Sequence, residues 1–148
     1  MKAVRKQALM WVFVLAAVVP SFAHHMAVVV DKDNRTGVVS SVYLAKLFRA
    51  DVRKWVDGRD VVIILHKDSP GEAETLQRLT KMSAADLKAF LAVHKDSIKT
   101  ADSDDDMLKL VESTPGAIGL VEVHAINDQV NVLKVDGRLP LEAGYLPH

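Results

Sequence analysis

The stretch TPGAIGLVE, residues 114–122, decides the fold of this chain because it joins a helix to a strand. Pro115 has no backbone N–H and disfavours a helical conformation at the residue before it, so the preceding helix should end there. Gly116 can adopt the positive φ that a sharp reversal needs. Gly119 lies inside the apolar run that follows and leaves room for another element to approach closely. The stretch therefore predicts a tight joint between an amphipathic helix and a buried strand.

Apolar strands and amphipathic helices alternate on both sides of this joint. Continuous apolar runs at 26–30 and 61–66 are typical of buried strands. Helices are expected after residues that can cap them, namely Ser40 or Ser41, Asp68 or Ser69, Ser83, and Asp102 or Ser103. A turn at 127–128 leads to one further strand, QVNVLKVDG (129–137), and the tail 138–148 has a loop-like composition. The pattern predicts an α/β fold with a mostly parallel or mixed sheet and helices on both faces.

The first 23 residues have the pattern of a cleavable signal peptide. Three cations, Lys2, Arg5 and Lys6, precede an apolar run at 8–19 and the small-residue site Ser21-Phe22-Ala23. The run is shorter than the roughly 20 residues that span a bilayer. We therefore expect residues 24–148 to form a single periplasmic unit with no membrane segment after the signal is removed.

Composition narrows the function classes. The whole chain balances 19 Lys and Arg against 19 Asp and Glu, so loss of the three signal cations leaves a net charge of −3. A nucleic-acid-binding protein usually carries a net positive charge or a basic patch, so this net negative charge argues against nucleic-acid binding. The absence of cysteine excludes disulfides and thiolate sites and is compatible with a bacterial periplasm.

Several segments, taken together, resemble the periplasmic phosphate-binding proteins of ABC importers. TPGAIGLVE resembles the T-P-G-A-I-G-Y-V segment of that family. SSVYLAKLF followed by KWVDG, and VVIILHKDSPGEAETL, are similar to further family segments in the same order, so that the resemblance covers 26–135. It implies one three-layer lobe of a type II periplasmic binding protein. Full-length members close two such lobes on the ligand, and about 125 residues suffice for one lobe only.

The loop HKDSPGE, residues 66–72, is the strongest candidate for a binding site. It lies between a predicted central strand and a helix, and a helix N-terminus offers unpaired N–H groups and positive partial charge to an anion. The family loop supplies Arg, Asp, Ser, Gly and Thr to the oxyanion. The resemblance places His66 at the Arg position and retains Asp68 and Gly71.

Two residues of this loop depart from the family pattern. Pro70 replaces the Ser and removes an N–H donor, while Glu72 replaces the Thr and would repel an anion if it were ionised. Ser69 supplies a hydroxyl one position away. Two interpretations stay open: weak or altered anion binding through His66, Asp68, Ser69, Gly71 and Glu72, or a helix cap without a ligand.

Other groups of residues carry weaker signals. The acidic run 102–106 lacks the spacing of an EF-hand and suits the first turn of a helix. The predicted terminus His24-His25 has the chemistry to chelate copper or is simply an inert end. The remaining histidines show no HxxxH or HExxH spacing for zinc, and no GxSxG, P-loop or SxxK motif indicates an enzyme. We expect neither a metal site nor a cofactor.

The sequence thus predicts an exported protein, similar to the substrate-binding proteins of phosphate transporters, that binds phosphate or another oxyanion weakly or in an altered way. A second lobe, from another copy of the chain or from another periplasmic protein, would cover the ligand. The alternative is a periplasmic accessory module that binds no ligand and docks on a transporter or sensor.

Overall fold

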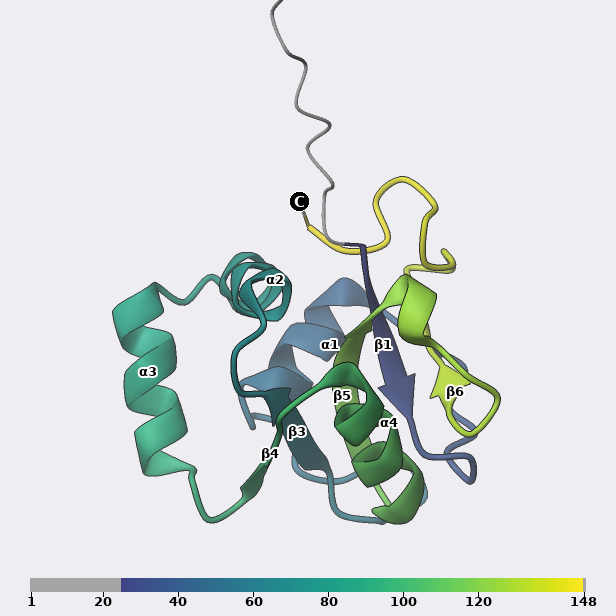
Figure 1. Ribbon diagram of the computed structural model, residues 1–148, viewed down its shortest axis with the longest axis horizontal. Helices are drawn as coiled ribbons and strands as arrows, with labels where there is room; N and C mark the ends of the chain where they lie inside the picture. The colour runs from purple at the N-terminus through teal and green to yellow at the C-terminus, as the bar shows by residue number, and fades with distance from the viewer. Residues whose placement is uncertain (1–24, 148) are drawn as a thin grey trace, which may run out of the picture.

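The computed structural model describes residues 25–147, so the predicted signal peptide lies outside the described residues. A five-stranded sheet of order β4-β3-β5-β1-β6 forms the centre (Figure 1). A second sheet has two strands, β2 and β7. The strands are β1 (Met26–Val30), β2 (Val38–Val39), β3 (Val62–His66), β4 (Ile98–Ala101), β5 (Ala117–Glu122), β6 (Asn131–Val132) and β7 (Lys134–Val135). The helices are α1 (Ser41–Phe48), α2 (Pro70–Thr80), α3 (Ala84–Val93), α4 (Asp104–Ser113) and the short 3₁₀ helix η1 (Val123–Ala125). None of the helices in this described part is long and apolar enough to cross a membrane.

The central sheet is mixed, as the sequence predicts. β3 pairs in parallel with both β4 and β5, whereas β1 pairs antiparallel with β5 and β6. Because β3, β4 and β5 run in the same direction, their carboxyl ends meet at one edge of the sheet. That edge carries the loops that lead into α2, α4 and η1.

Helices cover both faces of the sheet, and this confirms the expected three-layer lobe. Side chains of β1 alternate between the faces: Val28 and Val30 belong to the core cluster under α1 and α2, whereas Val29 packs with α4. Figure 1 shows α4 in front of the strands and α1 behind them. The helix α3 lies beside the edge strand β4, and none of its residues is buried.

Serine hydroxyls cap the four α-helices found within residues 25–147 and resolve the alternatives that the sequence left open. Ser40, Ser69, Ser83 and Ser103 each accept a hydrogen bond from the amide three residues later. Pro70 stands in the first turn of α2, where its missing N–H removes no helical bond.

The segment predicted as one strand at 129–137 is instead two short strands in different sheets. Its alternation is real, since Val130 packs on the α4 side while Leu133 and Val135 pack on the other. The pairing partner changes at Leu133, whose amide donates to Val28 O, and the chain then pairs with β2. The prediction of a single strand is wrong because the backbone beyond Leu133 pairs with another segment: Lys134 N donates to Gly37 O and Asp136 N to Val39 O.

The C-terminal tail has no helix or strand among its described residues, as expected, but it contributes to the core. Tyr145 is only 3% exposed. Its hydroxyl donates to Leu133 O at 2.6 Å and accepts from Val28 N at 3.1 Å. Burial raises the pKa of this phenol to about 12, so the hydroxyl keeps its proton and bridges the two backbone groups at any physiological pH.

Candidate functional site

The joint at Pro115 and Gly116 is a structural element. α4 ends at Ser113, and Gly116 has φ +80°, as the sequence predicts. The indole Nε1 of Trp55 donates to Gly116 O at 2.9 Å, and Gly116 N donates to the buried carboxylate of Asp31 at 3.2 Å. A Cβ on Gly116 would lie 2.0 Å from Asp60 O. The joint therefore holds the turn of residues 55–60 against the sheet and leaves no room for a ligand.

The candidate loop 66–72 lies where the carboxyl ends of β3, β4 and β5 meet. His66 ends β3, Asp68 follows in the turn, and Ser69, Gly71 and Glu72 form the start of α2. In open α/β sheets, ligands gather outside the carboxyl ends of strands. The structure thus brings the five predicted site residues together at the N-terminus of an 11-residue helix.

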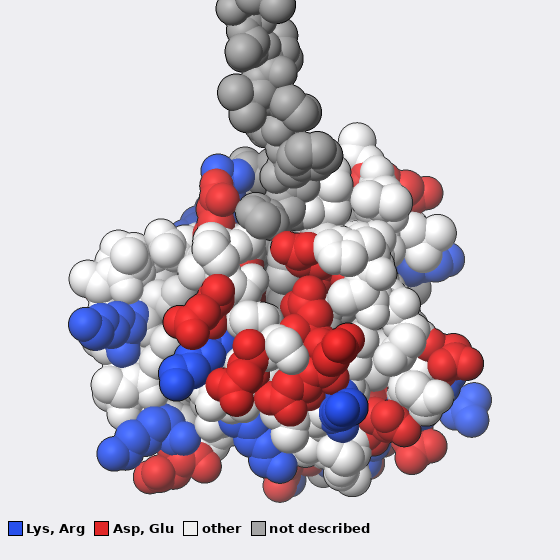
Figure 2. Space-filling model, in the orientation of Figure 1, with Lys and Arg blue, Asp and Glu red and all other residues white. Residues whose placement is uncertain are grey.

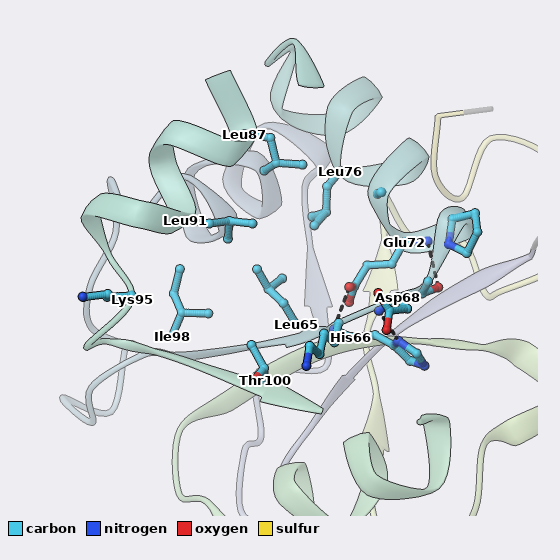
Figure 3. A pocket seen from close by; sticks show the side chains of 14 residues that line it. Leu65, His66, Asp68, Glu72, Leu76, Leu87, Leu91, Lys95, Ile98 and Thr100 are labelled. Carbon is cyan, nitrogen blue, oxygen red and sulfur yellow. Dashed lines mark hydrogen bonds between the residues drawn. The ribbon is translucent and has the colours of Figure 1, made fainter. Parts of the chain in front are cut away.

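Most amides of this loop are already hydrogen-bonded within the protein. His66 N donates to Glu72 Oε2 at 2.7 Å, Asp68 N donates to His66 Nδ1 at 3.2 Å, and Glu72 N donates to Ser69 Oγ at 3.2 Å (Figure 3). The amide of Gly71 donates to no atom within residues 25–147. An arriving anion would therefore find few unpaired donors and would compete with Glu72 for the amide of His66.

Glu72 is the most unusual residue of the site. It is 3% exposed, and its Oε1 atom is buried without a hydrogen-bond partner in the described part of the chain. Burial raises the pKa of this carboxyl to about 8; the hydrogen bond from the His66 amide opposes the rise, and the nearby Asp104 carboxylate adds to it. Glu72 is therefore mostly protonated at pH 7, so the repulsion expected from an ionised Glu72 is small at that pH.

Acidic side chains surround this edge of the sheet. Asp104, Asp105 and Asp106 stand in the first turn of α4, where they suit the helix dipole. Figure 2 shows acidic side chains gathered over α4 and the neighbouring strand ends. Burial raises the pKa of Asp104, and the neighbouring Glu122 carboxylate raises it further. The electrostatic field here is unfavourable to a multiply charged anion.

The other candidates from the sequence lie apart from the loop. His94 ends α3 with its ring 4.4 Å from the ring of Phe90, and His124 lies 3.2 Å from a carboxylate oxygen of Glu122. Within residues 25–147 no group of three or more His, Asp or Glu side chains is arranged to hold a metal ion. The copper hypothesis depends on His24, which lies outside the described residues.

A cavity of about 770 Å³, which the sequence interpretation missed, adjoins the loop. Its apolar wall is formed by Leu65, Leu76, Leu87, Leu91 and Ile98, and Figure 3 places Glu72 and Lys95 at opposite ends. The spacing of Leu87 and Leu91 gave a signal for an apolar helix face. The same spacing does not predict that a cavity remains between this face of α3 and the sheet.

Comparisons with known proteins agree with this arrangement. No family model matches the chain. The phosphate-binding protein PstS of Bacillus subtilis is 28% identical over 120 residues, which cover 78% of this chain and 37% of that protein. An ABC-type phosphate transport receptor from Vibrio cholerae matches with a TM-score of 0.65 at 13% identity, over 78% of this chain and 48% of that one. PstS from Borrelia burgdorferi matches with a TM-score of 0.63 at 14% identity, over 78% and 49%.

The three-layer lobe and its helix N-terminus at the strand ends define the class: this is the lobe fold of a periplasmic binding protein. Within that class the chain is a relative of the phosphate-binding proteins, and the resemblance seen in the sequence is confirmed. The chain spans 37% of the length of the Bacillus subtilis relative.

Proposed function

We propose that this protein is an exported, non-enzymatic solute-binding protein that binds phosphate or another oxyanion weakly. The observation that carries the proposal is the position of loop 66–72, where the N-terminus of α2 faces outward from the carboxyl ends of three parallel strands. Ser69 Oγ, the Gly71 amide and the imidazole of His66 are the groups available to the anion. Glu72 weakens binding, since its Oε2 atom occupies the His66 amide.

Part of the ligand site is proposed to come from a second lobe. The relatives with solved structures are about twice as long as the matched region. A second copy of this chain or another periplasmic protein would cover the anion. Sedimentation of the purified protein with and without sulfate tests the first option, and a monomer under both conditions would exclude it.

Thermal unfolding in the presence of phosphate, sulfate and a carboxylate panel tests anion binding. A ligand at 100 times its Kd stabilises a protein by about 2.7 kcal/mol. We expect a shift for the wild type only at millimolar anion, and a shift at lower concentrations for Glu72→Thr, which vacates the His66 amide and supplies a hydroxyl. The matched control is Glu74→Thr, because Glu74 is exposed on the same helix and pairs with Arg78. Failure of every anion with both the wild type and Glu72→Thr would refute the proposal.

The pH dependence of sulfate affinity provides a second test of anion binding, because the charge of sulfate does not change between pH 6 and pH 9. Glu72 ionises as the pH rises through about 8, and the new negative charge then opposes the anion. Wild-type affinity for sulfate should fall at least about fivefold across this range, which is equivalent to about 1 kcal/mol. The affinity of Glu72→Gln should stay constant. A parallel fall in both proteins would show that Glu72 does not face the anion.

A second candidate is an accessory module that keeps the lobe fold and docks on a transporter or sensor. The observation in its favour is the internal pairing of the His66, Asp68 and Glu72 amides. The same titration separates the candidates, since an accessory module responds to no anion.

A further inference from the structure

The cavity between α2, α3 and the edge of the sheet has the shape and lining of a small-molecule site. Its volume of about 770 Å³ lies within the range of known ligand pockets. Figure 3 shows leucines of α2 and α3 facing Leu65 of β3 and Ile98 of β4 across this space. Since no residue of α3 is buried, the helix forms a wall without closing the space.

One polar atom in the lining lacks a partner. Glu72 reaches into the cavity from α2, and Figure 3 shows its carboxyl group at the end next to His66. Its Oε2 atom accepts from His66 N, whereas its Oε1 atom has no partner within residues 25–147. A buried polar atom without a partner destabilises a fold by about 1–3 kcal/mol. Oε1 is closed to solvent in this conformation, and a bound molecule that displaced the side chain enough to supply a donor to it would remove this penalty.

The charges near Glu72 select the kind of donor. Lys67, Asp68 and Lys95 are exposed at the rim of the cavity, so solvent screens them. His66 of β3 donates its backbone amide, and Asp104 of α4 acts on Glu72 as a second negative charge. A cationic group at Oε1 would be attracted by both acids. An anionic group would be repelled by Asp104 at any pH at which that residue is ionised.

We propose that this cavity binds a small organic amine, whose ammonium group donates to Glu72 Oε1 and whose apolar body lies among the leucines. The aliphatic wall formed by Leu76, Leu87 and Leu91 accounts for the apolar body, and the buried carboxyl accounts for the charge. This site adjoins the anion site at the helix N-terminus and shares Glu72 with it, but the proposal does not rest on anion binding. An amine and an anion would interact with Glu72 in opposite ways.

Three probes of similar shape test the proposal at pH 8: 2-phenylethylamine, the neutral 2-phenylethanol and the anionic 3-phenylpropionate. Binding to the purified protein is followed by thermal unfolding and by the methyl resonances of Leu87 and Leu91, which locate the probe. We expect the amine to bind at least tenfold more tightly than the alcohol, and the acid to bind most weakly. The proposal is overturned if the acid binds as tightly as the amine, or if no probe moves these methyl resonances.

Two variants distinguish the contribution of the Glu72 carboxyl to amine binding from the contribution of the apolar cavity. Glu72→Gln keeps the acceptor for His66 N and should lower amine affinity at least tenfold, with less than a twofold effect on the alcohol. Leu91→Trp should fill the cavity and weaken all three probes. Glu74→Gln, on the exposed side of the same helix, should change none of them. Unchanged amine affinity in Glu72→Gln would overturn the assignment of Glu72, whether or not Leu91→Trp folds.

Discussion

Replacing Glu72 with Gln should stabilise the protein increasingly as the pH rises. In the unfolded chain this carboxyl has its ordinary pKa near 4.5, whereas burial raises the pKa to about 8 in the folded protein. Between these values the folded state binds more protons than the unfolded state. The free energy of unfolding therefore falls as the pH rises through this window, and Glu72 contributes most favourably below pH 4.5.

The size of the effect follows from the two pKa values. Each pKa unit corresponds to about 1.4 kcal/mol, so ionisation of Glu72 should lower the free energy of unfolding by about 4 kcal/mol between pH 5 and pH 9. Gln does not ionise and keeps an oxygen that can accept from His66 N. The difference in stability between Glu72→Gln and wild type should therefore grow by about 4 kcal/mol over this range, a large fraction of the stability of a small domain.

Urea denaturation of both proteins at each pH, followed by circular dichroism, measures this difference. Comparison of the two proteins cancels the contribution of most other titrating groups. Glu74→Gln serves as the control, since Glu74 is exposed and its loss should give a curve parallel to that of the wild type. If the wild type and Glu72→Gln lose stability in parallel from pH 5 to pH 9, Glu72 has an ordinary pKa and the argument from burial fails.

Two further predictions concern stability and are measured by urea denaturation at pH 7. Gly116→Ala should destabilise by about 3 kcal/mol or more, since its φ is +80° and the new Cβ would lie 2.0 Å from Asp60 O. Gly119→Ala should cost less, because the nearest atom to its Cβ is the flexible Met107 Sδ; equal losses would contradict this reasoning. Tyr145→Phe should cost about 2–3 kcal/mol, since it leaves two buried backbone groups unpaired, and a loss below about 0.5 kcal/mol would show that water replaces the hydroxyl.

The sequence predicts most of the fold because local chemistry and tertiary packing agree at the relevant positions. Pro115 and Gly116 favour the end of a helix for local reasons, and here Gly116 is also required by tertiary packing, since a Cβ would lie 2.0 Å from Asp60 O. The capping serines act within one turn of their helices, so their role is visible without the rest of the chain. Such features are local, and single-sequence reasoning identifies them.

The features that the sequence does not predict depend on distant partners. β4 has the sequence IKTA, in which only two of four residues are apolar, and it forms a strand because it pairs with β3. The change of partner at Leu133 depends on the distant segment 37–39, which receives the amides of Lys134 and Asp136. Tyr145 follows a Gly- and Pro-containing segment typical of a loop, and its burial depends on contacts more than ten residues away.

The candidate site also has one property that the sequence predicts, its location, and one that it does not predict, the protonation of Glu72. The resemblance locates loop 66–72, but the chemistry of Glu72 depends on burial, which residue type alone does not reveal. On the sequence alone, a glutamate at the helix N-terminus suggests a fixed negative charge. In the folded protein burial suppresses that charge at neutral pH, and one carboxyl oxygen is buried without a hydrogen-bond partner among the described residues.

A buried acid without a cationic partner is difficult to explain by stability. An uncharged side chain of similar size would pack in the same space without the penalty of desolvation. Buried polar groups without a partner are found most often at functional sites, where a ligand can supply the missing partner. We therefore propose that Glu72 marks the binding region more directly than the TPGAIG joint does. The joint carries the resemblance to the phosphate-binding proteins, whereas the proposed binding of an anion and the proposed binding of an amine both depend on the oxygen atoms of Glu72.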